Sequence, residues 1–167
     1  MSKLTALALS IAVLGGVWAF LALNPLAGAA LVWVGFIAWG CYFHTGGDNA
    51  ALQKTIAGMI FGAVMAGVAL YLVSSGMLGG LGALAAPVII AVTVFPLVIV
   101  AGYNLLSVVP ANVYGYAATA GLALTAGTAG NVTMMNMTNP VLLVAVSVVL
   151  GALFGMASGK LAGMLGK

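Results

Sequence analysis

The chain has 167 residues, of which 65% are hydrophobic and 3% are charged, and its formal net charge is +3. Soluble domains carry roughly 25% charged residues, so this composition cannot cover a surface that faces water. The mean hydropathy of +1.30 instead indicates a protein of the lipid bilayer. The single cysteine excludes an internal disulfide. The net charge comes from lysines at segment ends, so we expect no nucleic-acid partner.

Apolar segments bounded by Pro, Gly, Asn and charged residues follow one another along the chain. There are about six such segments, and each, at ~20 residues, is predicted to be long enough to cross ~30 Å of hydrocarbon as a helix. The first ends at Asn24-Pro25, and the fourth contains Pro87 and Pro96. We therefore predict an all-α integral membrane protein in which residues 1–167 form a single transmembrane domain. The predicted helices span residues 4–23, 26–43, 55–73, 81–102, 110–125 and 140–161.

The few charged residues indicate the orientation of the chain. They are Lys3, Asp48, Lys54, Lys160 and Lys167, and no formal charge lies between Lys54 and Lys160. With six spans and a cytoplasmic amino terminus, all four lysines fall on the cytoplasmic side. That arrangement satisfies the positive-inside rule, whereas five or seven spans would divide the lysines between the two sides. We predict that both termini are cytoplasmic.

Glycines recur at a spacing of four in the last segment. The four are Gly151, Gly155, Gly159 and Gly163. Gly58 and Gly62 repeat the same spacing in the third segment. Small residues at this spacing allow close packing between membrane helices, so we expect the last helix to pack tightly against a neighbour, in the same subunit or in another.

A weak internal repeat relates the two halves of the chain. A shift of 77 residues lays the second predicted helix on the fifth and aligns three pairs of residues. The pairs are Gly35 with Asn112, Trp39 with Tyr116, and Tyr42 with Thr119. Each half would hold three helices, an odd number, so the halves would be inverted in the membrane.

The six aligned residues lie on one face of each helix, because both sets follow the spacing i, i+4, i+7. Amide, phenol and hydroxyl groups inside a bilayer are costly unless they meet partners or water. One interpretation is a solute path narrowed by Trp39 and Tyr116, with hydrogen-bonding groups from Tyr42, Asn112 and Thr119 beside Gly35. The other is that these groups bond between helices and hold the bundle together.

Metal and catalytic sites have little support in this sequence. Cys41 and His44 lie three residues apart, but two ligands are fewer than a structural metal site needs. Met134, Met135 and Met137 have soft sulfur atoms without a neighbouring His or Cys, and contact with the membrane surface explains them better than copper. No acid–base pair or activated nucleophile lies in the apolar segments. We expect no enzyme activity, no metal and no cofactor.

Several short motifs resemble a known family. They are Gly16-Val-Trp18, Trp33-Val-Gly-Phe-Ile37, Tyr42-Phe43 followed by Gly46-Gly47, and Val109-Pro-Ala-Asn-Val-Tyr-Gly115. Together they resemble the YcdZ-like bacterial inner-membrane proteins, a domain family of unknown function. The resemblance implies a bacterial inner-membrane location and about six helices, and it supplies no substrate.

These observations predict a channel-like protein that passes a small uncharged solute. By analogy with small six-helix proteins that conduct urea or weak acids, we also expect a homo-oligomer. One alternative is a secondary transporter in which an inverted repeat gives alternating access. A second alternative is a non-conducting structural or assembly subunit whose glycine faces bind partner helices.

Overall fold

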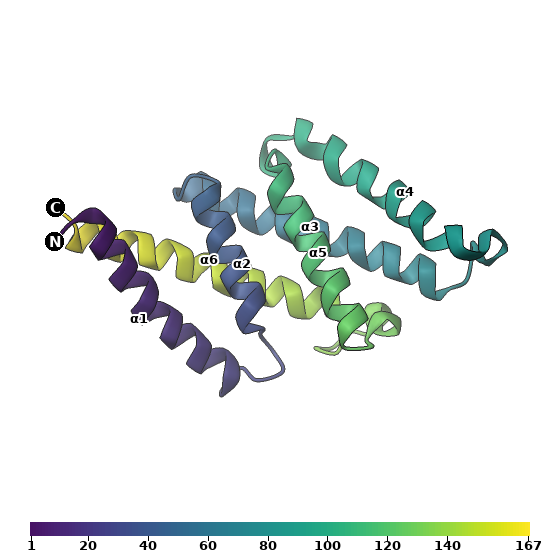
Figure 1. The fold of residues 1–167 in the computed structure, drawn as a ribbon, viewed down its shortest axis with the longest axis horizontal. Helices are drawn as coiled ribbons and strands as arrows, with labels where there is room; N and C mark the ends of the chain where they lie inside the picture. The colour runs from purple at the N-terminus through teal and green to yellow at the C-terminus, as the bar shows by residue number, and fades with distance from the viewer. The chain divides into compact units, whose positions relative to one another are not determined.

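A computed structural model describes all 167 residues, and its regular elements are all helical (Figure 1). Short 3₁₀ segments join several of the six α-helices. The α-helices are α1 (Lys3–Leu23), α2 (Val32–His44), α3 (Asn49–Ser74), α4 (Ala85–Ile99), α5 (Val109–Thr125) and α6 (Pro140–Leu165). The 3₁₀ segments are η1 (Gly79–Leu84), η2 (Val100–Gly102), η3 (Asn104–Leu106) and η4 (Ala129–Thr133).

Four helical stretches are long and apolar enough to cross a membrane, which is fewer than the six spans predicted. They are Lys3–Leu23, Asn49–Ser74, Gly79–Gly102 and Pro140–Leu165. The other two helices are shorter, with 13 residues in α2 and 17 in α5. At about 1.5 Å per residue they reach only about 20 and 26 Å, less than ~30 Å of hydrocarbon. The all-helical membrane class therefore holds, and the number of full spans was overestimated.

The second helix begins later than predicted, at Val32 instead of residue 26. The intervening residues form turns, in which Gly28 has a φ of 80° and the amide of Ala29 donates to the carbonyl of Leu26 at 2.8 Å. Leu31 is extended and caps the helix. Apolar composition alone could not distinguish these turns from helix, because the residues are as hydrophobic as the helix that follows.

The helices pack into two compact units. Unit 1 contains Met1–Ile56 and Val146–Lys167, and unit 2 contains Ala57–Ala145. Unit 1 therefore holds α1, α2, the start of α3 and most of α6, while unit 2 holds most of α3, all of α4 and α5, and the start of α6. These units differ from the two halves of the sequence. Most of α3, from the first half, belongs to unit 2, and most of α6, from the second half, belongs to unit 1.

Unit 1 has an aromatic core. Trp18 on α1 is fully buried and donates from Nε1 to the carbonyl of Val32 at 3.0 Å. Its ring centroid lies 5.5 Å from that of Phe154 on α6, and Trp39 on α2 lies 5.9 Å from the same ring. The two chain ends also meet in this unit, where the amide of Lys167 donates to the carbonyl of Met1 at 3.1 Å (Figure 1).

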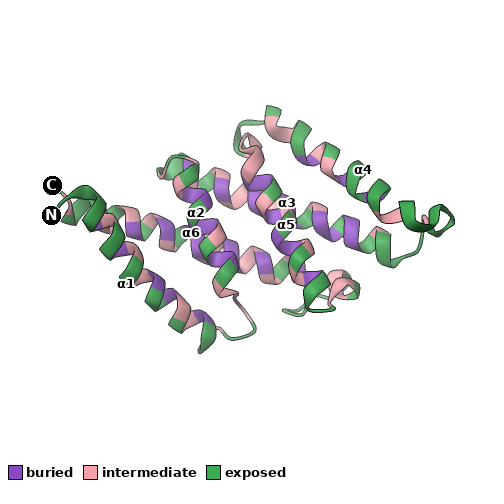
Figure 2. Ribbon diagram, viewed as in Figure 1, coloured by how far each residue is buried: buried purple, intermediate pink, exposed green.

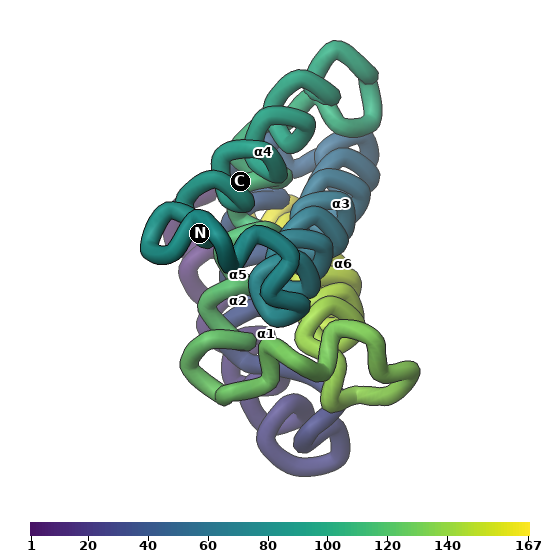
Figure 3. Tube along the Cα trace, turned by 90° about the vertical axis from the view of Figure 1, so that its right-hand side faces the viewer, coloured from purple at the N-terminus to yellow at the C-terminus, as the bar shows by residue number.

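Unit 2 contains the α3–η1–α4 hairpin and α5 (Figure 3). Helix α4 is buried along only one stripe, formed by Ile89, Thr93 and Leu97, and most of its other residues are exposed or half-buried (Figure 2). The positions four residues apart lie on one face of a helix, so α4 packs within its unit through a narrow seam. Its remaining apolar side chains are suited to contact with lipid.

Candidate functional site

Gly35, the first of the predicted path residues, lies where α2 crosses α6 inside unit 1. A Cβ atom at Gly151 would lie 2.2 Å from the carbonyl oxygen of Gly35 and 2.4 Å from its Cα. A Cβ at Gly35 would lie 2.4 Å from the ring of Trp18. Real Cβ atoms do not come this close to other atoms, so the crossing requires glycine on both helices.

Trp39 and Tyr42 are both buried, with 3% and 2% of their surface exposed. The indole Nε1 of Trp39 donates to Ser158 Oγ at 3.0 Å, and that hydroxyl donates in turn to the carbonyl of Gly155 at 2.8 Å. The phenol of Tyr42 donates to the carbonyl of Gly47. The polar atoms of both residues are therefore bonded within unit 1.

The glycines of α6 have three kinds of environment. Gly151 meets the backbone of α2, as described above. The Cβ position of Gly155 is 3.0 Å from Tyr42 and 3.2 Å from the Trp39 ring, while that of Gly159 is 3.5 Å from Phe43. At Gly163 nothing lies within 4 Å. Along α6, the first of these glycines thus contacts backbone, the next two contact aromatic rings, and the last has no neighbour.

Asn112, the first predicted path residue of unit 2, is fully buried on α5. Its Nδ2 donates to the carbonyl of Leu97 at 3.0 Å and to the carbonyl of Leu106 at 3.1 Å. The end of a helix leaves backbone carbonyls without helical partners, and Leu97 lies in the last turn of α4. The Asn112 amide therefore ties the end of α4 and the following η3 segment to α5.

Helix α5 crosses α3 at a backbone contact within unit 2. A Cβ at Gly62 would lie 1.9 Å from the carbonyl oxygen of Asn112, and a Cβ at Gly115 would lie 1.9 Å from that of Met59. The predicted pair Gly58 and Gly62 therefore lies at this crossing, since the Cβ position of Gly58 is 2.7 Å from Asn112 Oδ1.

The other two predicted residues of α5 differ in their bonding. The Tyr116 hydroxyl shares a hydrogen bond of 3.0 Å with Thr93 Oγ1 on α4. Thr119 is fully buried, and its Oγ1 has no hydrogen-bond partner. Asn112 Oδ1 is likewise buried and unpartnered. Buried polar atoms without partners are rare in native proteins and call for an explanation.

The sequence interpretation missed the residues that bond to the predicted ones. They are the buried hydroxyl residues Thr93 and Ser158. A third buried hydroxyl residue, Ser147, was also missed; its Oγ accepts from the amide of Leu31, outside the predicted set, at 2.9 Å. Thr93 is the only hydroxyl residue in α4, which is a signal that the sequence offered. Ser147 and Ser158 precede Gly151 and Gly159 on α6, and the prediction for this helix rested on its glycines alone.

The cysteine and histidine of α2 form no metal cluster. No group of three or more His, Cys, Asp or Glu side chains lies together in the structure. Cys41 is buried, and its sulfur accepts a hydrogen bond from Thr55 Oγ1 at 3.7 Å. The thiol therefore has a hydroxyl neighbour on α3 within unit 1.

The fold defines the class of this protein: its apolar composition and four membrane-length helices make it a membrane-embedded α-helical protein. Within that class, the chain belongs to the family described as "Protein of unknown function (DUF1097)", which matches residues 8–163. No curated protein and no solved structure matches it. The narrower resemblance to YcdZ-like proteins stays a prediction.

Proposed function

We propose that this protein passes a small uncharged solute across the bacterial inner membrane along a path that includes α5. The observation that carries the proposal is the pair of buried, unpartnered atoms Asn112 Oδ1 and Thr119 Oγ1. They come from positions seven residues apart, which lie on one face of a helix. Unpaired polar atoms in a membrane protein cost free energy, and a solute or water that bonds to them offsets that cost.

The chemistry of the two atoms defines the class of solute. Asn112 Oδ1 can only accept a hydrogen bond, whereas the Thr119 hydroxyl can donate or accept one. No Asp, Glu, Lys, Arg or His occurs in residues 57–145, so unit 2 has no formal charge to compensate an ion. These groups suit a small neutral solute with both donors and acceptors, such as water, an amide or a polyol.

In this proposal the ring of Tyr116 narrows the path. Its hydroxyl is held by Thr93 on α4, so the ring has a fixed position in unit 2. A fixed ring can act as a constriction, and pore width together with lining polarity determines selectivity. Gly35, Trp39 and Tyr42 lie in unit 1, and their part in a solute path stays a prediction.

A second candidate, alternating access by an inverted repeat, has its own observation. The cap residues of α2 and α5 are Leu31 and Val108, which are 77 apart (108 − 31). The carbonyls of Gly35 and Asn112, also 77 apart (112 − 35), each lie against a glycine of a long helix. The two short helices thus begin and cross at equivalent positions, which supports a repeat of the kind found in secondary transporters.

Stopped-flow light scattering from proteoliposomes tests transport directly. We expect vesicles with the protein to swell faster than empty vesicles for at least one neutral solute. The Thr119→Val variant should reduce that rate several-fold, while Thr125→Val should not, because Thr125 lies on the same helix but is exposed and bonds to its own backbone. A rate that rises linearly with solute concentration supports a channel, and saturation with counterflow supports a carrier.

The same vesicles test the structural alternative and the assembly state. If no solute moves and a partner protein co-purifies stoichiometrically, the protein is a structural subunit and the transport proposal fails. The proposal is of a transport protein without enzyme activity or cofactor, present as a homo-oligomer. Native mass spectrometry from detergent should show one oligomeric state, whose mass is a whole-number multiple, greater than one, of the 16.5 kDa chain.

A further inference from the structure

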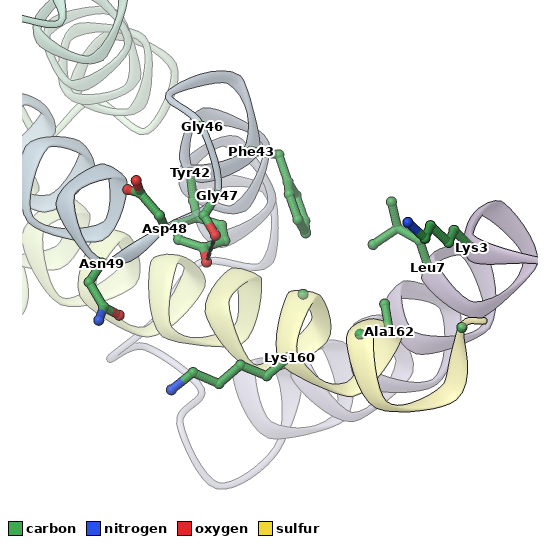
Figure 4. Close-up of a pocket in the computed structure, with 13 residues that line it drawn as sticks. Lys3, Leu7, Tyr42, Phe43, Gly46, Gly47, Asp48, Asn49, Lys160 and Ala162 are labelled. Carbon is green, nitrogen blue, oxygen red and sulfur yellow. Dashed lines mark hydrogen bonds between the residues drawn. The ribbon is translucent and has the colours of Figure 1, made fainter.

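An open groove of about 590 Å³ lies at the charged end of unit 1 (Figure 4). It is built from the start of α1, the end of α2, the loop that leads into α3, and the end of α6. Small-molecule sites in proteins span roughly 300–1,000 Å³, so the groove is large enough for a ligand. The residues that line it are Lys3, Leu7, Tyr42, Phe43, Gly46, Gly47, Asp48, Asn49, Gly159, Lys160, Ala162, Gly163 and Gly166.

The missing side chains of α6 create this groove. Gly159 has only ring atoms of Phe43 and Tyr42 within 4 Å of its Cβ position, and Gly163 has nothing within 4 Å. Leu7 from α1, Phe43 from α2 and Ala162 from α6 supply apolar surface. The groove therefore has apolar surface next to charged side chains. A lipid has the matching arrangement, because its polar headgroup lies next to its apolar acyl chains.

The charged residues of the groove leave one positive charge without compensation. Lys3 and Lys160 contribute +2 and Asp48 contributes −1, so the sum is +1. Neither lysine side chain makes an ion pair or a hydrogen bond in the structure. Asp48 directly precedes α3, and its Oδ1 accepts from the amide of Ala51 in the first turn of that helix at 2.7 Å. In Figure 4 Lys3 comes from α1 and Lys160 extends along α6 toward Asn49, so the two ammonium groups lie at separate edges of the groove.

We propose that this groove binds the headgroup of an anionic glycerophospholipid, with the phosphodiester between Lys3 and Lys160 and the start of the acyl chains against Leu7, Phe43 and Ala162. A phosphodiester has one negative charge, which matches the single excess positive charge of the lining. Lysine is a common phosphate-binding residue, and its long flexible stem lets the ammonium move to the anion. Basic pockets at the ends of membrane helices bind anionic lipid headgroups in this way. The site is independent of the observation that carries the transport proposal, since Asn112 and Thr119 belong to unit 2 and do not line the groove.

Lipid titration in detergent, followed by native mass spectrometry, tests this site. We expect phosphatidylglycerol to bind at least tenfold more tightly than phosphatidylcholine, which has a phosphodiester but no net charge. The double variant Lys3→Gln/Lys160→Gln should lose that preference. The matched control is Lys54→Gln/Lys167→Gln, which removes two lysines of the same unit that do not line the groove and should retain it.

Two further arms separate a lipid site from other causes. Gly163→Leu places a side chain in the open part of the groove without a change in charge, and it should weaken phosphatidylglycerol binding at least tenfold. Inorganic phosphate at the same concentration should not compete with the lipid. Equal losses in both double lysine variants, an unaffected Gly163→Leu variant, or full competition by phosphate would each overturn the proposal. Thermal melting of every variant without lipid verifies that each is folded.

Discussion

The two units of this protein use the same kind of helix crossing and surround it with different chemistry. In unit 1, α2 meets α6 at Gly35 and Gly151; in unit 2, α5 meets α3 at Gly115 and Gly62. Unit 1 has stacked and tilted aromatic rings around its crossing, and it holds all the charged residues of the chain. Unit 2 has no charged residue, and its crossing is surrounded by amide and hydroxyl groups.

This difference separates the residues that build the fold from those that are free to serve a function. Backbone contact at glycine is common to both units, so it belongs to the architecture. The buried indoles of unit 1 both donate hydrogen bonds, whereas unit 2 keeps two buried polar atoms unpaired. Unpaired polar atoms weaken a fold, and their presence in only one unit is the reason that the proposed solute path includes α5.

The largest effect is expected at the crossings themselves. Gly62→Ala and Gly151→Ala place a Cβ 1.9 and 2.2 Å from a carbonyl oxygen of the facing helix, so the helices must separate. Overpacking of this kind costs about 1–3 kcal/mol and sometimes more, and we expect the upper end of that range in both units. Unfolding by SDS titration in mixed micelles measures the loss.

Two glycines without neighbours provide the controls for these variants. Gly121 on α5 and Gly163 on α6 have nothing within 4 Å of their Cβ positions. Alanine at either position should be neutral or stabilising by up to about 1 kcal/mol, because Gly is the poorer helix former. If Gly62→Ala or Gly151→Ala behaves like these controls, the close crossing is wrong for that unit, and the comparison between the units fails.

A smaller loss is expected when the amide of unit 2 is removed. Asn112→Leu leaves the carbonyls of Leu97 and Leu106 without their Nδ2 donor. An unsatisfied buried polar group costs about 1–3 kcal/mol, so the free energy of unfolding should fall by an amount in that range. Asn112→Asp, which keeps the shape but replaces the two N–H donors with a carboxyl group that has at most one donor, should also lose stability. Full stability of both variants would show that the amide does not hold α4 to α5.

The corresponding change in unit 1 should cost less. Trp39→Phe removes the bond from Nε1 to Ser158 Oγ, but that hydroxyl keeps its bond to the carbonyl of Gly155. One ordinary hydrogen bond contributes about 0.5–1.5 kcal/mol, and the ring contact with Phe154 is largely retained. A loss in unfolding free energy as large as that of Asn112→Leu would contradict the view that aromatic packing, not polar bonding, dominates unit 1.

Most of the helices, and part of the candidate site, could be predicted from the sequence. Composition gave the membrane class, and the breaks at Asn24-Pro25 and Pro140 gave two helix ends within a residue or two. The start of α2 was missed because the turns before it are apolar. The partners Thr93 and Ser158 were missed because no local pattern links a hydroxyl to an aromatic residue 23 or 119 positions away. Only packing between helices brings such residues together.

The smallest change in stability should accompany the largest change in function, at Thr119. Thr119→Val replaces an unpartnered hydroxyl with a methyl group of similar shape, and such a replacement is nearly neutral or stabilising. Thr93→Val is the matched comparison in unit 2, since it removes a hydroxyl that bonds to Tyr116 and to the backbone and should cost about 0.5–1.5 kcal/mol. If Thr119→Val is as destabilising as Thr93→Val, the hydroxyl has a structural partner and the basis of the transport proposal is lost. Unchanged stability together with slower vesicle swelling would show that the Thr119 hydroxyl contributes to solute transport and not to folding.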